Sequence, residues 1–580
     1  MKNRKQRNIR PARKLLTCAL ASCLMLGMAP AFAQSTGATL RGQVSADSAP
    51  ATDAKVTVTN LATGLTRSVQ ANSSGGYSLG GLPPGSYRVD VTAGGQTSSQ
   101  NVTLSVGQTA TLNLGVGGVA ETAAGEATTL EAVTVVAPAL LETKTSEVAT
   151  YVTQKQINAL PQSSRNFLAF ADIVPGMIFD TKGDGSTQLR SGAQNSNGIN
   201  VFIDGIGQKN YVLKGGIGGQ DGSRGNPFPQ LAIGEYKVIT SNYKAEYDQI
   251  SSAAVTAVTK SGTNEFHGDF FWDRSGTPDW RTRTPAEERA GGAKQPSGET
   301  QYGAALGGPI IQDKLFFFVT YEAKQFEIPR NVSLGGGVPF GTPVPPDLIP
   351  LLGPSSTPFD EDLFFGKLTW QLGDANLIEF SAKRREEAEI KDIGDRNTES
   401  YGKTNNNEST RLDLRWQWSG INWLNDAHIT HEDEFFNPRA ITIAPGINIQ
   451  NPTGGTILNV GGGQDFQDKG QKGLGLQDDL TFTGWEGHTI KMGVKYKSVE
   501  INAFEQQPYN PQFRVDLIAN QAVGNNSLDT FVPYSVRFGA PLPGVGDRNI
   551  TTTNKQYGIY FQDDWEINEK LTLNLGLRYD

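Results

Sequence analysis

The chain has 580 residues, a formal net charge of −8, 67 glycines, four histidines and two cysteines. The length allows several domains, and the acidic balance argues against nucleic acid as a partner. Cys18 and Cys23 both lie near the N-terminus, so the remaining sequence has no disulfide and no thiolate metal site.

Residues 1–33 are typical of a secretory signal peptide. Residues 1–14 hold seven basic residues and no acid, a mostly apolar run follows, and Ala-Phe-Ala precedes Gln34. We expect cleavage between Ala33 and Gln34, which would lower the formal charge from −8 to −15. A lipoprotein cut before Cys23 and a transmembrane anchor are weaker alternatives. The rest of the sequence has no apolar run of about 18 residues, so any membrane span would be a strand.

Residues 36–117 predict an all-β module. "GATLRGQVSA", "AKVTVTNLATG" and "QNVTLSVGQTATLNLGV" alternate apolar and polar residues between turn residues. About seven short strands in this length suggest a β-sandwich. The string "GGYSLGGLPPGSYRVDV" resembles the carboxypeptidase regulatory-like domain, a transthyretin-like sandwich. The module has no histidine, so we do not expect the enzyme that this name implies.

Residues 118–142 predict a linker with one short β-prone segment, "EAVTVVA". Val133, Val135 and Val136 favour an extended chain, and Pro138 blocks a helix. Such a strand on a tether of small residues is an aggregation hazard unless something pairs with it. It is either a strand that awaits a partner or an edge strand of a neighbouring domain.

Residues 143–262 predict a compact α+β unit. Thr153 and Gln156 form a potential capping box for a helix that Pro161 ends, and Ser164 is a candidate cap for a second helix. Strand-like "GINVFIDGIGQ", a Gly-rich loop, "AIGEYKVITSNY" and "SSAAVTAVTKSGTN" follow.

Residues 263–580 predict about a dozen strands, many near the length of about 9–11 residues that crosses a membrane. In "RLDLRWQW" the apolar residues from Leu412 to Trp418 alternate with polar ones. A soluble sandwich with one wet face would alternate too. Aromatic residues near strand ends, such as Phe270 to Trp272 and Phe316 to Phe318, favour an antiparallel transmembrane β-barrel instead.

The whole of residues 36–580 resembles the TonB-dependent outer-membrane receptors, specifically the Oar-like (OmpA-related) group. The most specific match is "QLAIGEYKVITSNYKAEYDQISSAAVTAVTKSGTNEFHGDFFWDR", residues 230–274, which in that family joins the plug domain to the first barrel strand. "NVFIDGIGQ" resembles the V-x-x-DG segment of the plug, at Val201, Asp204 and Gly205. The resemblance implies a mainly β fold: a sandwich, a small α+β plug and a barrel.

The resemblance also implies a role for the short strand. In the family, a TonB box reaches into the periplasm and the inner-membrane-anchored TonB protein pairs with it as an added strand. That box would comprise Glu131, Ala132, Val133, Thr134, Val135, Val136 and Ala137. The implied function is TonB-dependent transport of an unknown extracellular ligand through a plugged barrel in outer-membrane lipid, with the sandwich in the periplasm.

One departure from the family concerns the barrel. Barrels of this family have about 22 strands, whereas the sequence predicts about 12 and stops at Asp580. We therefore expect a fragment or a truncated gene product.

Three other motifs could suggest a metal, phosphate or catalytic site, but each has a simpler structural explanation. His428 and His431 would point to opposite faces of a strand, so a shared metal is not expected. The glycines between Gly215 and Gly225 lack the G-K-[ST] of a phosphate loop. The charged run "RREEAEI", from Arg384, is interpreted as a strand that runs out into a charged loop. The sequence predicts no enzyme, no metal and no cofactor.

Alternative functions remain open at this point. A structural or adhesive outer-membrane protein, with the sandwich as a binding module, would need neither a plug nor a TonB box. A signalling receptor that controls an anti-sigma factor would carry an N-terminal module with helices, which residues 36–117 lack. Import and export are both compatible with the sequence.

Overall fold

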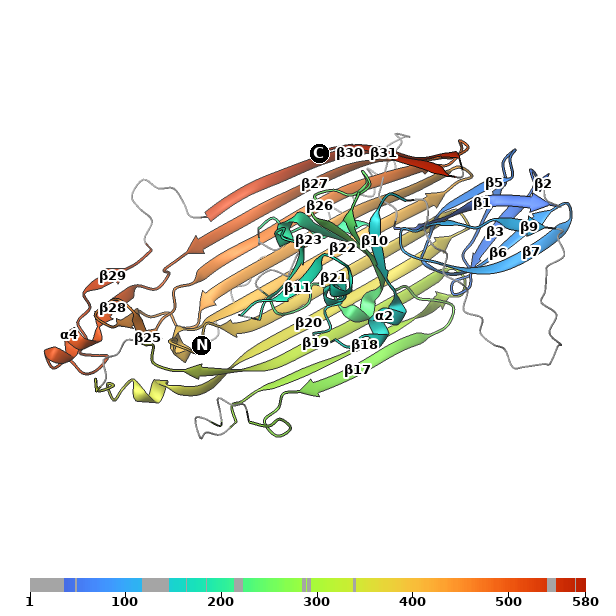
Figure 1. Ribbon diagram of the computed structural model, residues 1–580. Helices are drawn as coiled ribbons and strands as arrows, with labels where there is room; N and C mark the ends of the chain where they lie inside the picture. The colour runs from blue at the N-terminus through green and yellow to red at the C-terminus, as the bar shows by residue number, and fades with distance from the viewer. Residues whose placement is uncertain are drawn as a thin grey trace, which may run out of the picture.

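The computed structural model shows three parts: a small double sheet, a compact unit beside a large curved sheet, and the large sheet itself (Figure 1). The structure describes residues 36–46, 49–116, 145–162, 164–183, 185–212, 223–283, 288, 294–336, 341–539, 549–568 and 570–580. Within these ranges, no helix is long and apolar enough to cross a membrane.

The N-terminal part is a sandwich of two sheets. The first contains β1 (Ala38–Ala46), β2 (Ala49–Pro50), β5 (Gly76–Leu82), β8 (Thr109–Thr111) and β9 (Leu114–Val116). The second has the order β4-β3-β6-β7 and comprises β3 (Lys55–Asn60), β4 (Thr66–Gln70), β6 (Gly85–Ala93) and β7 (Gln96–Leu104). Alternate residues of both sheets point inward, as with Leu40 and Leu79 of the first sheet and Val56 and Val89 of the second, and form one apolar core.

The middle part is the plug, built on a mixed sheet of order β10-β15-β16-β13-β14. Its elements are β10 (Val148–Val152), α2 (Gln154–Ala159), η1 (Phe167–Ile173), β11 (Met177–Thr181), β12 (Thr187–Ser191), η2 (Ser196–Gly198), β13 (Ile199–Ile203), β14 (Ile206–Gly207), η3 (Gln230–Ala232), β15 (Ile233–Ser241) and β16 (Ala253–Thr259).

The helix caps of the plug test two sequence predictions. Thr153 and Gln156 form the expected capping box at α2. The second cap is wrong: Asn166, not Ser164, caps η1, and the element is a 3-10 helix. Both side chains can accept a hydrogen bond from a backbone amide. Asn166 is the cap because η1 begins at Phe167, whose ring is buried in the core.

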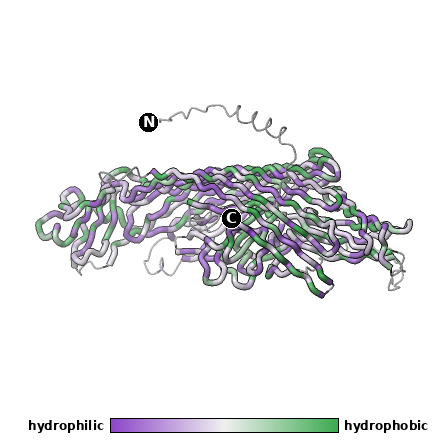
Figure 2. Tube along the Cα trace, turned by 90° about the horizontal axis from the view of Figure 1, so that it is seen from above, coloured by the Kyte–Doolittle hydropathy of each residue, from purple (hydrophilic) through white to green (hydrophobic). Residues whose placement is uncertain are grey.

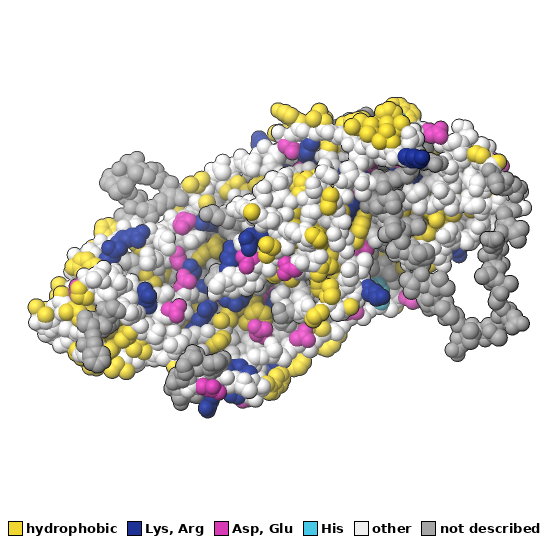
Figure 3. Space-filling model, viewed as in Figure 1, with side chains coloured by type: hydrophobic (Ala, Val, Ile, Leu, Met, Phe, Trp, Pro, Cys, Tyr) yellow, Lys and Arg dark blue, Asp and Glu magenta, His cyan; other side chains and the backbone are white. Residues whose placement is uncertain are grey.

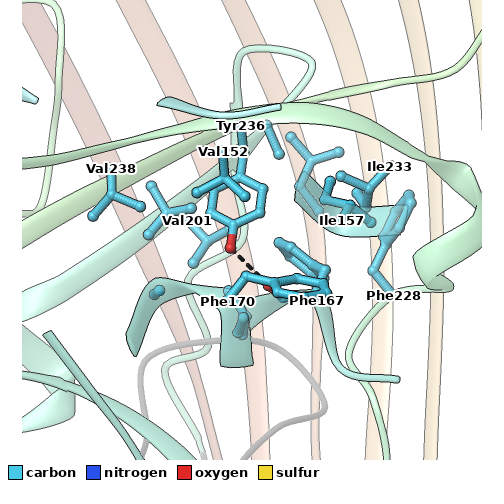
Figure 4. Close-up of a cluster of buried hydrophobic side chains, with 14 of the residues drawn as sticks. Val152, Ile157, Phe167, Phe170, Val201, Phe228, Ile233, Tyr236 and Val238 are labelled. Carbon is cyan, nitrogen blue, oxygen red and sulfur yellow. Dashed lines mark hydrogen bonds between the residues drawn. The ribbon is translucent and has the colours of Figure 1, made fainter. Parts of the chain in front are cut away.

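The core of the plug is formed where η1 packs on the sheet (Figure 4). The rings of Phe167 and Tyr236 meet edge to face with centroids 5.8 Å apart. The Tyr236 hydroxyl donates to the Phe167 carbonyl oxygen at 3.0 Å, which satisfies a polar group in an otherwise apolar site.

The large sheet is antiparallel, 11-stranded and open, with β17 and β31 as its outer strands. Its strands are β17 (His267–Ser275), β18 (Gly298–Ile311), β19 (Leu315–Val332), β20 (Gly353–Leu372), β21 (Asn376–Lys391), β22 (Lys403–Ser419), β23 (Trp423–Ala440), β26 (Phe466–Phe482), β27 (His488–Gln506), β30 (Asn549–Asn568) and β31 (Leu571–Tyr579). Short turns join strands at one end, called here the short-turn end, and long connections lie at the other, the long-loop end.

The two faces of this sheet have the polarity opposite to that of a soluble protein. In β22, Arg411, Arg415 and the other odd-numbered residues from 405 to 417 are buried, whereas Leu412 and Trp416 are exposed. Polar and apolar residues alternate in this way along the strands (Figure 2). Exposed tryptophans concentrate near the short-turn end, at positions 370, 416, 418, 423 and 565. An apolar outer face with an aromatic belt is the pattern of a membrane β-barrel wall.

The long connections fold into a packed lobe, called here the loop lobe. It contains η4 (Ile349–Leu351), η5 (Glu399–Tyr401), β24 (Gly446–Gln450), β25 (Thr456–Gly461), β28 (Gln512–Asp516), α4 (Leu517–Ala522) and β29 (Ser535–Arg537) (Figure 1). Its own apolar core includes Ile449, Leu458 and Val515. The polar segments 394–410 and 461–473 leave this lobe and continue into β22 from Lys403 and into β26 from Phe466.

The mainly β fold predicted from the sequence, with sandwich, plug and antiparallel barrel sheet, is confirmed. The structure does not reach residues 1–35 and 117–144, so the cleavage site at Ala33 and Gln34 and the segment from Glu131 to Ala137 lie outside the described residues.

Candidate functional site

The plug lies against the polar face of the large sheet, and charged side chains join the two. Basic and acidic groups gather on this concave face between the plug and the loop lobe (Figure 3). Lys244 of the plug pairs with Asp564 of β30 at 2.9 Å, and Glu246 with Lys491 of β27 at 3.2 Å. These bonds hold the plug inside the curve of the wall.

The V-x-x-DG segment forms one of these anchors. Val201 is buried in β13, and Asp204 and Gly205 turn the chain toward β14 with φ of 50° and 89°. The Asp204 carboxylate accepts from the Thr259 amide at 2.9 Å and the Thr259 hydroxyl at 2.6 Å. Lys367 of β20 lies 3.4 Å from the same carboxylate. The segment therefore joins two plug strands to the barrel wall.

The Asp204 anchor continues into a ladder of ion pairs along the wall. The Lys367 ammonium lies 3.0 Å from Glu379, and Arg415 bridges Glu379 at 2.9 Å and Asp426 at 2.5 Å. All of these side chains are buried. Because each charge has a partner of opposite sign, the desolvated network tolerates its burial.

We predict that Asp204→Ala weakens the end of β16 by about 2–3 kcal/mol, because the Thr259 amide and hydroxyl lose charge-assisted hydrogen bonds. Hydrogen–deuterium exchange of residues 253–259 measures the effect. Asp273→Ala, which removes an exposed carboxylate from β17, is the control and should leave that exchange unchanged. Equal exchange in both variants would contradict the anchor.

A second anchor corrects the interpretation of "RREEAEI". The run lies inside β21 rather than in a loop, and its residues alternate between the two faces. Arg385 is fully buried, 3.1 Å from Glu361, and also pairs with Glu387. Glu361 accepts from the Asn226 amide of the plug at 2.7 Å. Every second residue of this charged run faces the plug and forms part of its docking site. The sequence pattern does not reveal this burial.

The Gly-rich plug loop enters this second anchor. Residues 213–222 lie outside the described part of the chain. Its last residues are described: the Ser223 hydroxyl donates to Glu387, and Arg224 pairs with Glu389 at 2.8 Å. The loop therefore ends on carboxylates of the wall.

The histidine pair does not form a shared site. His428 is buried beside Asp413, with Nδ1 3.1 Å from the carboxylate, whereas His431 lies on the opposite face of β23, as predicted. Within the described residues, no group of three or more His, Cys, Asp and Glu side chains is arranged to hold a metal ion.

A basin of about 830 Å³ opens between the loop lobe and the wall, and is called here the loop basin. Four basic and two acidic side chains line it, with several amides: Arg330, Lys391, Arg396, Lys403, Asp392, Asp395, Asn397, Asn405, Asn459 and Gln467. Lys403 is neutralised by Asp392 at 2.8 Å and Asp465 at 2.9 Å. Among the described residues, Arg330 and Arg396 form no ion pair. The sequence pattern contained no signal for this basin, because it is assembled from three separate connections and the strand ends beside them.

A further contact links the plug to the sandwich. The Glu235 carboxylate of β15 accepts from the Val106 amide of the sandwich. Burial raises the pKa of Glu235 to about 7. An acid with a raised pKa stabilises the closed contact most below its ordinary pKa of 4.5, and this stabilisation is lost as pH rises through about 7.

We predict that the Val106 amide becomes less protected from hydrogen exchange, after correction for the intrinsic rate, between pH 5.5 and pH 8. Glu235→Gln should abolish this pH dependence, because the amide does not titrate. A wild-type protein with the same protection at both pH values would show that Glu235 does not control the contact.

Comparison with known proteins identifies the class. Residues 258–339 and 351–580 match the outer membrane beta barrel domain, and the chain belongs to this family. Residues 39–116 match the carboxypeptidase regulatory-like domain. The chain is therefore an outer-membrane β-barrel protein with a regulatory-like sandwich, as predicted. In this family short turns face the periplasm and long loops face outward.

One characterised protein is similar to this chain in sequence, and two solved structures are similar to it in fold. The chain is 27% identical over 320 residues to the TonB-dependent transporter Oar of Myxococcus xanthus, a match that covers 52% of this chain and 28% of that transporter. The outer-membrane transporter YddB from Escherichia coli superposes with a TM-score of 0.53 at 12% identity, covering 74% of this chain and 56% of YddB. A variant of the ferric enterobactin receptor from Pseudomonas aeruginosa gives 0.50 at 15%, covering 74% and 56%. The two structures show a shared fold.

Proposed function

We propose that this protein is a TonB-dependent outer-membrane transporter. The observation that carries the proposal is the plug held against the polar face of a membrane-barrel wall by ion pairs of Asp204, Arg224 and Lys244 with Lys367, Glu389 and Asp564. A plug inside a barrel blocks the passage of solutes unless the plug can be moved. A purely structural or adhesive barrel needs no such internal domain. The relatives named above are transporters and receptors, and we assign this chain no catalytic role.

The energy would come through the segment from Glu131 to Ala137. The outer membrane has no nucleotide supply, so work has to arrive by contact with a partner in the periplasm. An exposed extended strand can pair with TonB through backbone hydrogen bonds, which transmit a pull along the chain. The plug follows this segment in the sequence, and its ion pairs with the wall are what the pull would have to break.

The loop basin supports a ligand that is polar and carries anionic groups. Arg330 and Arg396 have guanidinium groups that match carboxylates or phosphates, and the surrounding amides suit hydroxyl and carbonyl groups. The basin lies at the long-loop end, which faces the outside, so it would take its ligand from the extracellular side.

The experiment measures plug movement and needs no ligand. Ala232, fully buried in η3 between plug and wall, is replaced by cysteine in a chain whose Cys18 and Cys23 are serines. Maleimide labelling of Ala232→Cys in whole cells should rise when TonB is present and energised. The rise should disappear with Val135→Pro, which removes a backbone donor from the strand. Labelling that is the same with and without TonB would overturn the proposal.

A further inference from the structure

The sandwich contacts the barrel at the short-turn end, where it lies in Figure 1. The Asn264 amide, just before β17, donates to the Ala62 carbonyl oxygen at 2.9 Å. At the opposite side of the sheet, Arg41 pairs with Glu566 near the end of β30. The sandwich therefore spans this end of the wall from its first strand almost to its last.

Contacts also lie between these two extremes. The Ser74 hydroxyl donates to Glu486, in the turn between β26 and β27, at 2.5 Å. Gly81 packs against Leu424 of β23 so closely that a Cβ atom there would lie 2.5 Å from the leucine. The fit of small residues to the turns shows that this surface of the sandwich matches the rim of the barrel.

Arg67 is the deepest of these contacts. Its side chain donates to the carbonyl oxygens of Gly80 and Gly81, each at 2.9 Å, and to the Gln417 side chain of β22 at 2.8 Å. Gln417 in turn lies 3.5 Å from Asp426, which belongs to the ion-pair ladder that ends at Asp204. A single polar network thus connects the sandwich, the wall and the plug.

A cavity of about 360 Å³ lies between the three parts. The sandwich contributes Asn60 and Leu65 to its lining, the plug Val258 and Ser261, and the wall Thr369 among others. The cavity therefore lies between the plug and the sandwich at the short-turn end of the wall, and the sandwich forms one side of it.

We propose that the sandwich is a detachable closure of the barrel's inner mouth, which shuts the cavity below the plug and has to undock before a solute can pass. The passage of a solute rests on the proposed function, whereas the docking of the sandwich on the barrel does not. The interface is built mainly from hydrogen bonds and an ion pair, as is typical of domain contacts that open and close. The expected TonB-binding segment lies between sandwich and plug in the sequence, so one pull would act on both.

The test reverses one ion pair and then restores it. Ser261→Cys, in the cavity lining, is the reporter in a chain without Cys18 and Cys23, and labelling with a charged maleimide is followed in isolated outer membranes. Arg41→Glu and Glu566→Arg each place like charges together and should speed labelling about tenfold. The double variant, with the pair exchanged, should return the rate close to that of the parent.

Two further measurements separate undocking from unfolding. Arg88→Glu reverses a charge on the exposed surface of the sandwich and should leave labelling unchanged. A chain with Ser74→Cys and Glu486→Cys should form a cross-link between sandwich and barrel, and this link should keep the reporter protected in the Arg41→Glu background. Single reversals without effect, or an effect that the exchanged pair does not correct, would overturn the closure. Because no TonB is present, failure of transport would not change these results.

Discussion

Arg385→Met should release the plug from one wall of the barrel and cost about 3–5 kcal/mol, because it leaves buried carboxylates without their cation. Arg385 is fully buried between Glu361 and Glu387, and Glu361 holds the Asn226 amide of the plug. Lys324, 3.7 Å from Glu361, can compensate only in part. We expect the described residues 223–226 to lose protection from hydrogen exchange.

The adjacent residue provides a matched control. Arg384 precedes Arg385 on β21 but points to the other face, where it pairs with Glu386 and Glu408. Arg384→Met makes the same chemical change and should leave the plug unaffected, because exposed ion pairs contribute little. Adding Glu387→Gln to Arg385→Met should restore part of the protection, since it removes one orphaned charge. Equal effects of the two arginine variants would show that Arg385 does not hold the plug.

Phe167→Ala should destabilise the plug itself by about 3–5 kcal/mol. The ring is fully buried, packs edge to face on Tyr236 and fills the space between η1 and the sheet (Figure 4). Its loss leaves a cavity that the surrounding strands cannot close without moving. Hydrogen exchange should therefore rise across β13, β15 and β16 together, rather than at one anchor.

Phe266→Ala is the control for this variant, because Phe266 lies before β17 and is 69% exposed. It should leave the exchange of the plug strands unchanged. If Phe167→Ala left those strands as protected as in the parent protein, the plug would not be the cooperative unit that its core indicates.

The strands of the wall were predictable because their alternation is local. The pattern from Leu412 to Trp418 required only period two, and the structure places these residues on one exposed face. Alternation alone does not say which face is wet, since a soluble sandwich has the same pattern. The family resemblance supplied that orientation, and the buried Arg411 and Arg415 confirm it.

The docking sites were not predictable, because each depends on residues far apart in the chain. In the sequence, Arg385 and Glu387 are typical of a solvated charged loop, and only the folded chain brings Ser223 of the plug to Glu387 and Asn226 to Glu361. The loop lobe and its basin likewise combine separate connections. The contact of Arg67 with Gln417 joins residues of different domains, and no local pattern encodes such a pair.

In the proposed function, a periplasmic partner pulls on the segment from Glu131 to Ala137. The most direct measurement is the affinity of the purified periplasmic domain of TonB for the whole chain, with Val135→Pro and Glu131→Ala compared in parallel. We expect Val135→Pro to weaken binding at least about tenfold, because proline removes a donor from the added strand. Glu131→Ala keeps every backbone donor and should bind as the parent does. Equal binding by the parent and Val135→Pro would contradict the claim.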